Sequence, residues 1–291
     1  SSSFKIFKSY LDEEYIGRYL AYLVLSQNFH TGRHHNNRLI FDPWKGQIFP
    51  VVTDPSFDFN TNTNLDYSNN DLISFLNQSS YFIDLKFQYL KKLLFEENII
   101  DKEINYLINS KQSINNVIRK DPILTNIIPE IFIKNENFKM IESAISVLKD
   151  RKKILKAELK RNPNVYWKKE ENNFSLILND QLPISKIELT FDEKIPKWVF
   201  LDENYNNIYD KNEIKFFRNN NKIILNTGLY ANRLNSNDLY NLINNNIKIT
   251  PTKFNFISSN GSSPLKIKIS NFFFKKRCSC KICTEKNNHC H

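Results

Sequence analysis

Apolar residues recur at helical spacing through the first half of the chain. The first such stretch is residues 10–27, in which the apolar positions come after three acidic residues, Asp12, Glu13 and Glu14. An Asp cap and early acidic residues favour a helix start, because they satisfy or complement the free N–H groups of the first turn. The same spacing returns in four further stretches, near residue 71 and over 84–95, 101–119 and 137–159. The pattern predicts an α-helical bundle across residues 71–160.

A short alternating segment interrupts these helices. Residues 38–41 and 47–53 alternate like strands on either side of an Asp-Pro-Trp-Lys-Gly turn at 42–46. Alternation with a glycine-containing turn predicts an antiparallel hairpin. A polar, His-rich stretch over 28–37 would enter this hairpin, and Asp54 would leave it.

The period changes from helical to alternating after Asn162-Pro163-Asn164. Short strands are predicted from Val165 onward, at 174–178, 187–191, 198–201, 214–217, 222–225 and 265–269. Even spacing of short strands is typical of a small sandwich of immunoglobulin-like type. The sequence thus predicts an α+β chain with three parts: residues 1–162, an all-β sandwich-like module over 163–274, and a basic Cys/His tail over 275–291.

Composition limits the classes of partner. The 291 residues carry a net charge of +10, which attracts phosphates and acidic surfaces. The lysines are dispersed, with no block of five or six basic residues, so a solvated basic surface is favoured and nucleic-acid binding is not expected. The absence of an apolar run of about 18 residues predicts no membrane span. The start at Ser1-Ser2-Ser3, without Met, indicates a processed or incomplete chain.

Polar side chains flank the predicted hairpin on both sides. Asn36 precedes the first strand and Asp54 follows the second. Carboxylate and amide oxygens suit Mg²⁺, which takes few protein ligands and completes its shell with phosphate oxygens and water. Protein kinases place an Asn and an Asp in this way to hold the metal ions that bridge the phosphates. Taken singly, the two residues could equally belong to ordinary turns.

The order of features over residues 10–60 resembles the spore-coat-protein-H (CotH) kinase family. His35 and Asn36 match the family's His-Asn pair, and Asp54 matches the acid with the role of the kinase Asp-Phe-Gly aspartate. The following helices, including Arg151, are similar to the family's helical half. The resemblance implies a partial protein-kinase-like lobe that uses Mg²⁺ and ATP to phosphorylate protein hydroxyls. It also implies a secreted or cell-surface location, with a protein substrate or a coat-protein partner.

Two departures from the family bear on catalysis. The family's catalytic Asp should precede Asn36, yet residues 30–35 contain no carboxylate. His30, His34 or His35 could take its place near the acceptor, because imidazole titrates near neutral pH. The alternative is a pseudokinase that serves as a structural surface or coat protein. The family's strand-borne Lys and phosphate-covering loop are expected upstream of Ser1.

Two clusters could instead bind transition metals. His30 and His34 stand four residues apart, but the Glu of a zinc-protease motif is absent and Gly32 disfavours a helix. In the tail, Cys278, Cys280, Cys283, His289 and Cys290 are potential zinc ligands without the usual paired spacing. An unstructured terminus with incidental thiols is the favoured interpretation.

Overall fold

The computed structural model describes residues 9–27, 38–52, 63–66, 71–120, 130–170, 173–192, 194–211, 213–233, 249–270 and 278–280. They fall into two compact units. The first comprises Ser1–Thr63 and Leu85–Glu158, and the second comprises Asn64–Asp84 and Leu159–His291. The sequence did not predict that Asn64–Asp84 would belong with the β-strands.

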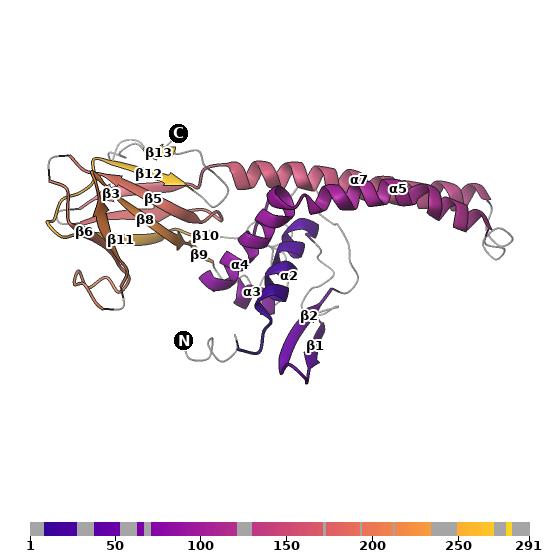
Figure 1. Cartoon of the computed structure of the whole chain (residues 1–291), viewed down its shortest axis with the longest axis horizontal. Coiled ribbons are helices and arrows are strands. Elements are labelled where there is room, and N and C mark those ends of the chain that lie inside the picture. The colour runs from indigo at the N-terminus through magenta and orange to yellow at the C-terminus, as the bar shows by residue number, and fades with distance from the viewer. Residues whose placement is uncertain are drawn as a thin grey trace. The chain divides into compact units, whose positions relative to one another are not determined.

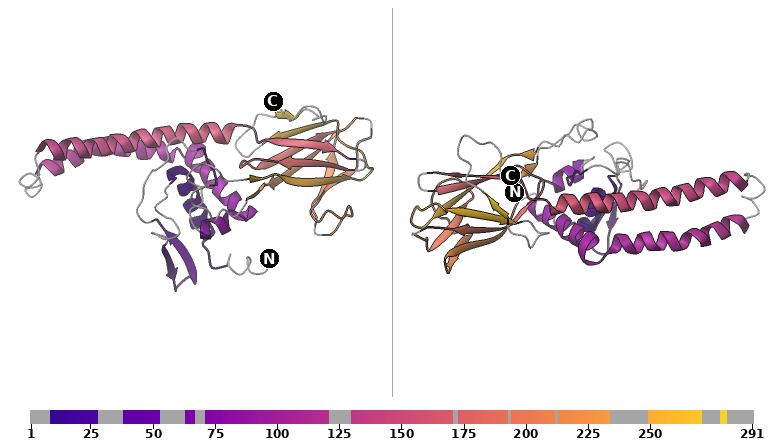
Figure 2. Two further views of the ribbon diagram at one scale, coloured as in Figure 1. Left: turned by 180° about the vertical axis from the view of Figure 1, so that it is seen from behind. Right: turned by 90° about the horizontal axis from the view of Figure 1, so that it is seen from above.

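Helices and one hairpin build the first unit, as the sequence predicted (Figure 1). Its elements are α2 (Glu13–Ser26), β1 (Arg38–Asp42), β2 (Gln47–Val51), most of α4 (Ser80–Lys91), the π-helix Lys92–Glu96, α5 (Ile99–Lys120) and nearly all of α7 (Glu130–Lys160). Helices α5 and α7 run antiparallel and side by side in all three views (Figures 1 and 2). Ion pairs between Lys111 and Glu142 and between Lys152 and Asp101 join the two helices.

Helix α2 begins at the predicted cap. The Asp12 carboxylate accepts a hydrogen bond of 2.8 Å from the N–H of Tyr15, which satisfies one free donor of the first turn. The apolar side chains of Ile16, Leu20 and Leu23 lie fully buried, as their helical spacing indicates. The helix is therefore fixed by its cap and its apolar face together.

The β1–β2 hairpin has the predicted position and turn. Arg38 pairs with Val51 at its open end, and Asp42 pairs with Gln47 beside the turn. The Asp42 carboxylate accepts from the N–H of Trp44 at 2.9 Å, and Gly46 adopts a left-handed φ of 63°. Glycine reaches this conformation without the steric cost that a Cβ would impose.

The second unit is built on one antiparallel sheet of nine strands in the order β13-β12-β5-β8-β7-β6-β11-β4-β3. Its strands are β3 (Val165–Lys169), β4 (Asn173–Leu178), β5 (Ile184–Thr190), β6 (Trp198–Asp202), β7 (Lys215–Asn219), β8 (Lys222–Leu229), β11 (Thr252–Ser258), β12 (Lys266–Ser270) and β13 (Cys278–Cys280). A separate two-stranded pair joins β9 (Asn232–Arg233) and β10 (Ile249–Thr250). The short helix α3 (Asp71–Leu76) completes the unit.

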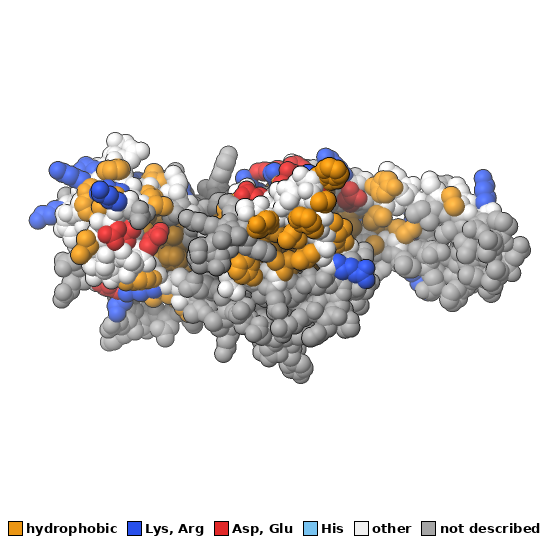
Figure 3. Space-filling view, turned by 90° about the horizontal axis from the view of Figure 1, so that it is seen from below, with side chains coloured by type: hydrophobic (Ala, Val, Ile, Leu, Met, Phe, Trp, Pro, Cys, Tyr) orange, Lys and Arg blue, Asp and Glu red, His pale blue; other side chains and the backbone are white. Residues whose placement is uncertain are grey.

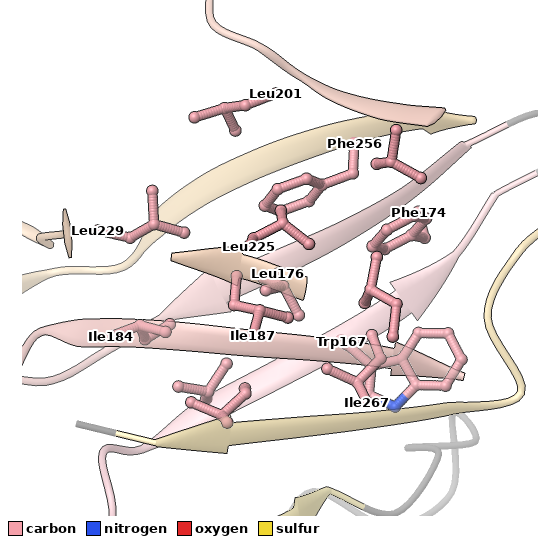
Figure 4. Packing of buried hydrophobic residues seen from close by; sticks show 14 of the residues in the cluster. Trp167, Phe174, Leu176, Ile184, Ile187, Leu201, Leu225, Leu229, Phe256 and Ile267 are labelled. Atoms are coloured by element: carbon pink, nitrogen blue, oxygen red, sulfur yellow. The ribbon is translucent and has the colours of Figure 1, made fainter. Parts of the chain in front are cut away.

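The sheet curls around a single apolar core (Figure 4). Phe174 and Phe256 stack within it at a ring separation of 5.2 Å, and Leu225 and Ile267 are fully buried there. The predicted sandwich of two sheets is therefore corrected to one continuous curled sheet. Alternation identified the strands, but the β7–β8 ladder that makes the sheet continuous depends on pairing between strands, which alternation does not specify.

The chain before α3 and the first part of α4 attach to this unit through polar contacts. The Gln181 amide accepts from the N–H of Leu65 at 2.6 Å and donates to the Asn64 amide oxygen at 2.9 Å. Tyr230 donates its hydroxyl to Asp84 at 2.8 Å. These partners lie far away in the sequence, so helical periodicity gave no sign of them.

Part of the tail is ordered into the sheet. Cys278 and Cys280 lie in β13, which pairs with Ile267 and Ile269 of β12. An unstructured tail was expected, and for these residues that expectation is wrong. Cys283, His289 and Cys290 lie outside the described residues, so the zinc alternative stays a prediction.

The surface agrees with the dispersed charge in the sequence. On the face drawn in Figure 3, the Lys and Arg side chains of the described residues are scattered and form no continuous basic patch.

Within the described ranges, no helix has both the length and the apolar character needed to cross a bilayer.

Candidate functional site

The open end of the β1–β2 hairpin frames the candidate metal site. Arg38 and Val51 are cross-strand partners, so the chain enters and leaves the hairpin at the same end. Asn36 precedes Arg38 by two positions, and Asp54 follows Val51 by three. Asn36, Asp54, His30, His34 and His35 themselves lie outside the described residues, so their predicted roles stay predictions.

Strand β2 is attached to helix α2 by side-chain and backbone bonds. Tyr15 donates its hydroxyl to the carbonyl of Pro50 at 2.7 Å, and its ring packs edge-on against Phe49 at 5.3 Å. The N–H of Ile48 donates to the carbonyl of Tyr10 at 2.7 Å, just before the helix. Burial raises the pKa of the Tyr15 hydroxyl, which keeps it a hydrogen-bond donor.

A buried arginine holds the other end of α2. Arg151 is 0% exposed, and its guanidinium donates to the carbonyls of Val24 and Leu25 at 2.8 and 2.9 Å. These carbonyls belong to the last turn of the helix, where partners within the helix are lacking and a cation complements the dipole. Burial lowers the pKa of Arg151 to about 10.

The C-cap completes this helix end. Gln27 adopts a left-handed φ of 51°, and its N–H donates to the carbonyl of Leu23 at 2.8 Å. Its side-chain amide donates to Val24 at 3.0 Å. The stretch over 28–37 therefore starts from a helix end at which the carbonyls of Leu23, Val24 and Leu25 accept hydrogen bonds, and it ends at a strand that pairs with β2. The described residues at both ends of this stretch are thus held by hydrogen bonds.

Comparison with known proteins gives no relative. No family model, curated protein or solved structure matches this chain. The CotH resemblance thus depends on the residues quoted above. Helix α2, the hairpin and the later helices occupy the predicted stretches.

A second polar group, which the sequence analysis did not single out, lies in the connection between β6 and β7. Asp202 at the end of β6 and Glu213 just before β7 are both buried carboxylates. Asn204, Asn206 and Asp210 lie between them. Their alternate spacing is readable in the sequence, but Asn is also a common turn residue, so the spacing alone does not single out the group.

Within the described part of the chain, no group of three or more His, Cys, Asp or Glu side chains is placed to hold a metal ion by itself. A metal site built from described residues would therefore need oxygen atoms from amides or the backbone. The β6–β7 connection supplies both.

Proposed function

We propose that the first unit is a CotH-like, partial kinase lobe that binds a magnesium nucleotide and transfers its terminal phosphoryl group to protein hydroxyls. One observation supports it above the others. The cross-strand pair Arg38–Val51 joins the two segments that carry Asn36 and Asp54 to the same end of one hairpin. A catalytic-loop Asn and a post-hairpin Asp are the residue types with which kinases hold their metal ions.

The roles follow from the chemistry of each side chain. Asn36 and Asp54 would supply oxygen ligands to Mg²⁺, with phosphate oxygens and water completing the shell. His30, His34 or His35 would accept the proton of the attacking hydroxyl. The hydroxyl oxygen gains the phosphoryl group, and the nucleoside diphosphate leaves.

Fixed anchors favour such a site. Catalytic groups gain most when the surrounding structure holds them before the substrate arrives. Arg151 secures the end of α2, where the His-containing stretch starts, and Tyr15 ties α2 to β2, whose pairing with β1 holds the end of that stretch. The two contacts together fix the described residues on either side of that stretch.

A second candidate is a non-catalytic pseudokinase that acts as a surface or coat structural protein. The observation that favours it is the lack of any carboxylate in residues 30–35, where the family has its catalytic Asp. Under this alternative, the hairpin and helices are kept for assembly with a protein partner at the cell surface. Nucleotide binding could persist without transfer.

Thermal shift with Mg·ATP on the full-length protein tests both candidates. We expect millimolar Mg·ATP to raise the Tm, because a ligand that binds only the folded state stabilises it. Asp54→Ala and Asn36→Ala should abolish the rise. Asp192→Ala, an exposed acid on the β-unit, should not.

Transfer of labelled phosphate to a generic protein substrate separates the candidates. Transfer that is lost in a His30, His34 or His35→Ala variant supports the kinase. A Tm rise without transfer supports the pseudokinase. No Tm rise at millimolar nucleotide, with or without magnesium, rules out the nucleotide site.

A further inference from the structure

The β6–β7 connection carries oxygen-bearing side chains at a particular spacing. Counted from Asp202 as the first position, Asn204, Asn206, Asp210 and Glu213 take the third, fifth, ninth and twelfth. These are the positions that supply side-chain ligands in the twelve-residue calcium loop of EF-hands, and a backbone carbonyl serves at the seventh. Here the seventh residue is Ile208.

The backbone of the loop turns where that pattern requires it. The sixth position of such loops is normally Gly, because the chain turns sharply there. Asn207 takes this position and adopts a left-handed φ of 62°. Asn is the side chain that tolerates this conformation best after Gly, so the substitution keeps the turn.

The polar side chains converge on one another. The two carboxylate oxygens of Asp202 accept from the N–H groups of Asn206 and Asn207, both at 3.2 Å. The Asp210 carboxylate accepts from the side-chain amides of Asn204 and Asn206. Hydrogen bonds therefore connect Asp202 and Asp210 through the Asn residues between them.

Glu213 closes this group from the other end of the loop. Its carboxylate accepts from the N–H of Glu203 at 2.9 Å and from that of Asp210 at 3.0 Å. The residue at the twelfth position thus reaches back to the second and the ninth. Calcium loops use that Glu as a bidentate ligand.

The loop buries negative charge. Asp202 is 1% exposed and Glu213 is 7% exposed. Among the described residues, neither they nor Asp210 form an ion pair with Lys or Arg, although Glu188 and Asp180 of the same unit do. Buried carboxylates are costly unless they are paired or coordinate a metal.

An independent observation on a neighbouring strand points to a cation. Asn255 of β11 lies directly opposite Asp202 of β6, so the two side chains stand on the same face of the sheet. Asn255 is only 7% exposed, and its amide oxygen accepts no hydrogen bond from the described residues. A buried acceptor without a donor, beside a buried carboxylate, is a group that a cation would satisfy.

We propose that the 202–213 loop binds a calcium ion, held by Asp202, Asn204, Asn206, Asp210, Glu213 and the carbonyl of Ile208. The three carboxylates alone do not form a metal-holding group. The amides of Asn204 and Asn206 turn their N–H groups toward Asp210. Their Oδ1 atoms accept from the N–H groups of Asn206 and Ile208 at 3.0 and 2.7 Å, and each amide oxygen has a second lone pair that is available to a cation.

The ligand chemistry selects calcium. Every candidate donor is oxygen, and the loop contains no His or Cys. Six or more oxygens in a flexible loop suit Ca²⁺, whereas Mg²⁺ demands tighter octahedral geometry and zinc prefers nitrogen and sulfur. The ion would fasten the end of β6 to the start of β7 and so stabilise the sheet.

Calorimetric titration of the full chain with CaCl₂ tests this site. We expect one ion per chain with a Kd at or below about 1 mM, the range of weaker calcium modules. Calcium at about ten times the Kd should raise the Tm of the β-unit by about 3 °C over the value in EGTA. Tb³⁺ should bind in its place and emit on tyrosine excitation, because Tyr205 and Tyr209 lie in the loop.

Variants separate this loop from other acids. Asp202→Asn and Glu213→Gln should weaken calcium binding by about tenfold or more, which is the loss of roughly one charged ligand. Asn206→Ala replaces an exposed ligand, so we expect this variant to fold. It therefore tests the site even if the variants of the buried Asp202 and Glu213 do not fold. Asp192→Asn is the matched control and should bind as the parent does.

Two results would overturn the site. One is the absence of heat, Tm change and Tb³⁺ emission at about 5 mM metal, well above the range expected for such loops. The other is binding that Asn206→Ala and Glu213→Gln leave unchanged. Neither result touches the nucleotide proposal, because Asn36 and Asp54 belong to the other unit.

Discussion

The Nε of Arg151 donates to the carbonyl of Leu25 at 2.9 Å, across a separation of 126 residues in the sequence. The same guanidinium reaches Val24, so one side chain of α7 caps the last turn of α2. This contact connects the long C-terminal helix of the first unit to the point where the His-containing stretch starts. Its removal should therefore affect both stability and the proposed site.

Arg151→Met should lower the free energy of unfolding by about 3 kcal/mol, because two buried carbonyls lose charge-assisted donors and Met supplies none. Urea unfolding measures the loss. Lys153→Met, on an exposed part of the same helix, is the control and should change stability by less than about 0.5 kcal/mol. A loss for Arg151→Met no larger than that of the control would contradict the capping role.

Gly17 permits close packing between α2 and α4. A Cβ at this position would lie 2.5 Å from Cδ2 of Tyr89 and 3.3 Å from Cβ of Leu85. Gly→Ala in a helix ordinarily gains up to about 1 kcal/mol. Here Gly17→Ala should instead destabilise by about 1–2 kcal/mol, because the Tyr89 ring must move away.

A double-mutant cycle checks this interpretation. With Tyr89→Ala in place, Gly17→Ala should become less destabilising or stabilising, by up to about 1 kcal/mol, since only the close approach to Leu85 then opposes helix propensity. Chemical unfolding of the four proteins gives the coupling. Stabilisation by Gly17→Ala in both backgrounds would show that the ring gives way freely.

Alkaline pH should weaken the first unit through Tyr19. Burial raises the pKa of its hydroxyl to about 12, with Tyr15 and Tyr22 adding to the rise. The folded state thus keeps a proton that the unfolded chain releases near pH 10. The stabilisation is complete below pH 10 and is lost as the pH rises from 10 through 12, by about 3 kcal/mol in all.

Tyr19→Phe should remove this loss, so its unfolding free energy should decline less between pH 10 and 12 than that of the parent. Urea unfolding at several pH values measures the difference. Tyr10→Phe is the control, because Tyr10 is half exposed. Equal slopes for the parent and Tyr19→Phe would refute the assignment.

The local elements were readable from the sequence. The spacing of Ile16, Leu20 and Leu23 gave α2, and Asp12 gave its cap, because a helix depends on contacts a few residues apart. The hairpin followed from alternation around the turn that ends at Gly46. The five residues of the predicted nucleotide site came from a pattern of residue types, and their roles remain to be tested.

The proposed calcium loop was not recognised from the sequence, although its ligand spacing is present there. The positions of Asp202, Asn204, Asn206, Asp210 and Glu213 were all visible in the sequence. Asn runs in this chain are common, so spacing alone did not distinguish ligands from turn formers. The amide oxygen of Asn255, which lies on another strand and accepts no hydrogen bond from the described residues, is the observation that distinguishes this loop from a turn.

By itself, the sequence determined most of the helices and strands, because cap residues and apolar periodicity act over one or two turns. It did not predict β9, β10, β11 or β13. Only the tertiary structure decided that Arg151 closes α2, that Asn64–Asp84 joins the β-unit, and that nine strands form one curled sheet. Each of these depends on contacts between residues far apart in the chain. Such contacts form when separate apolar faces are buried together, and no local pattern records which faces will meet.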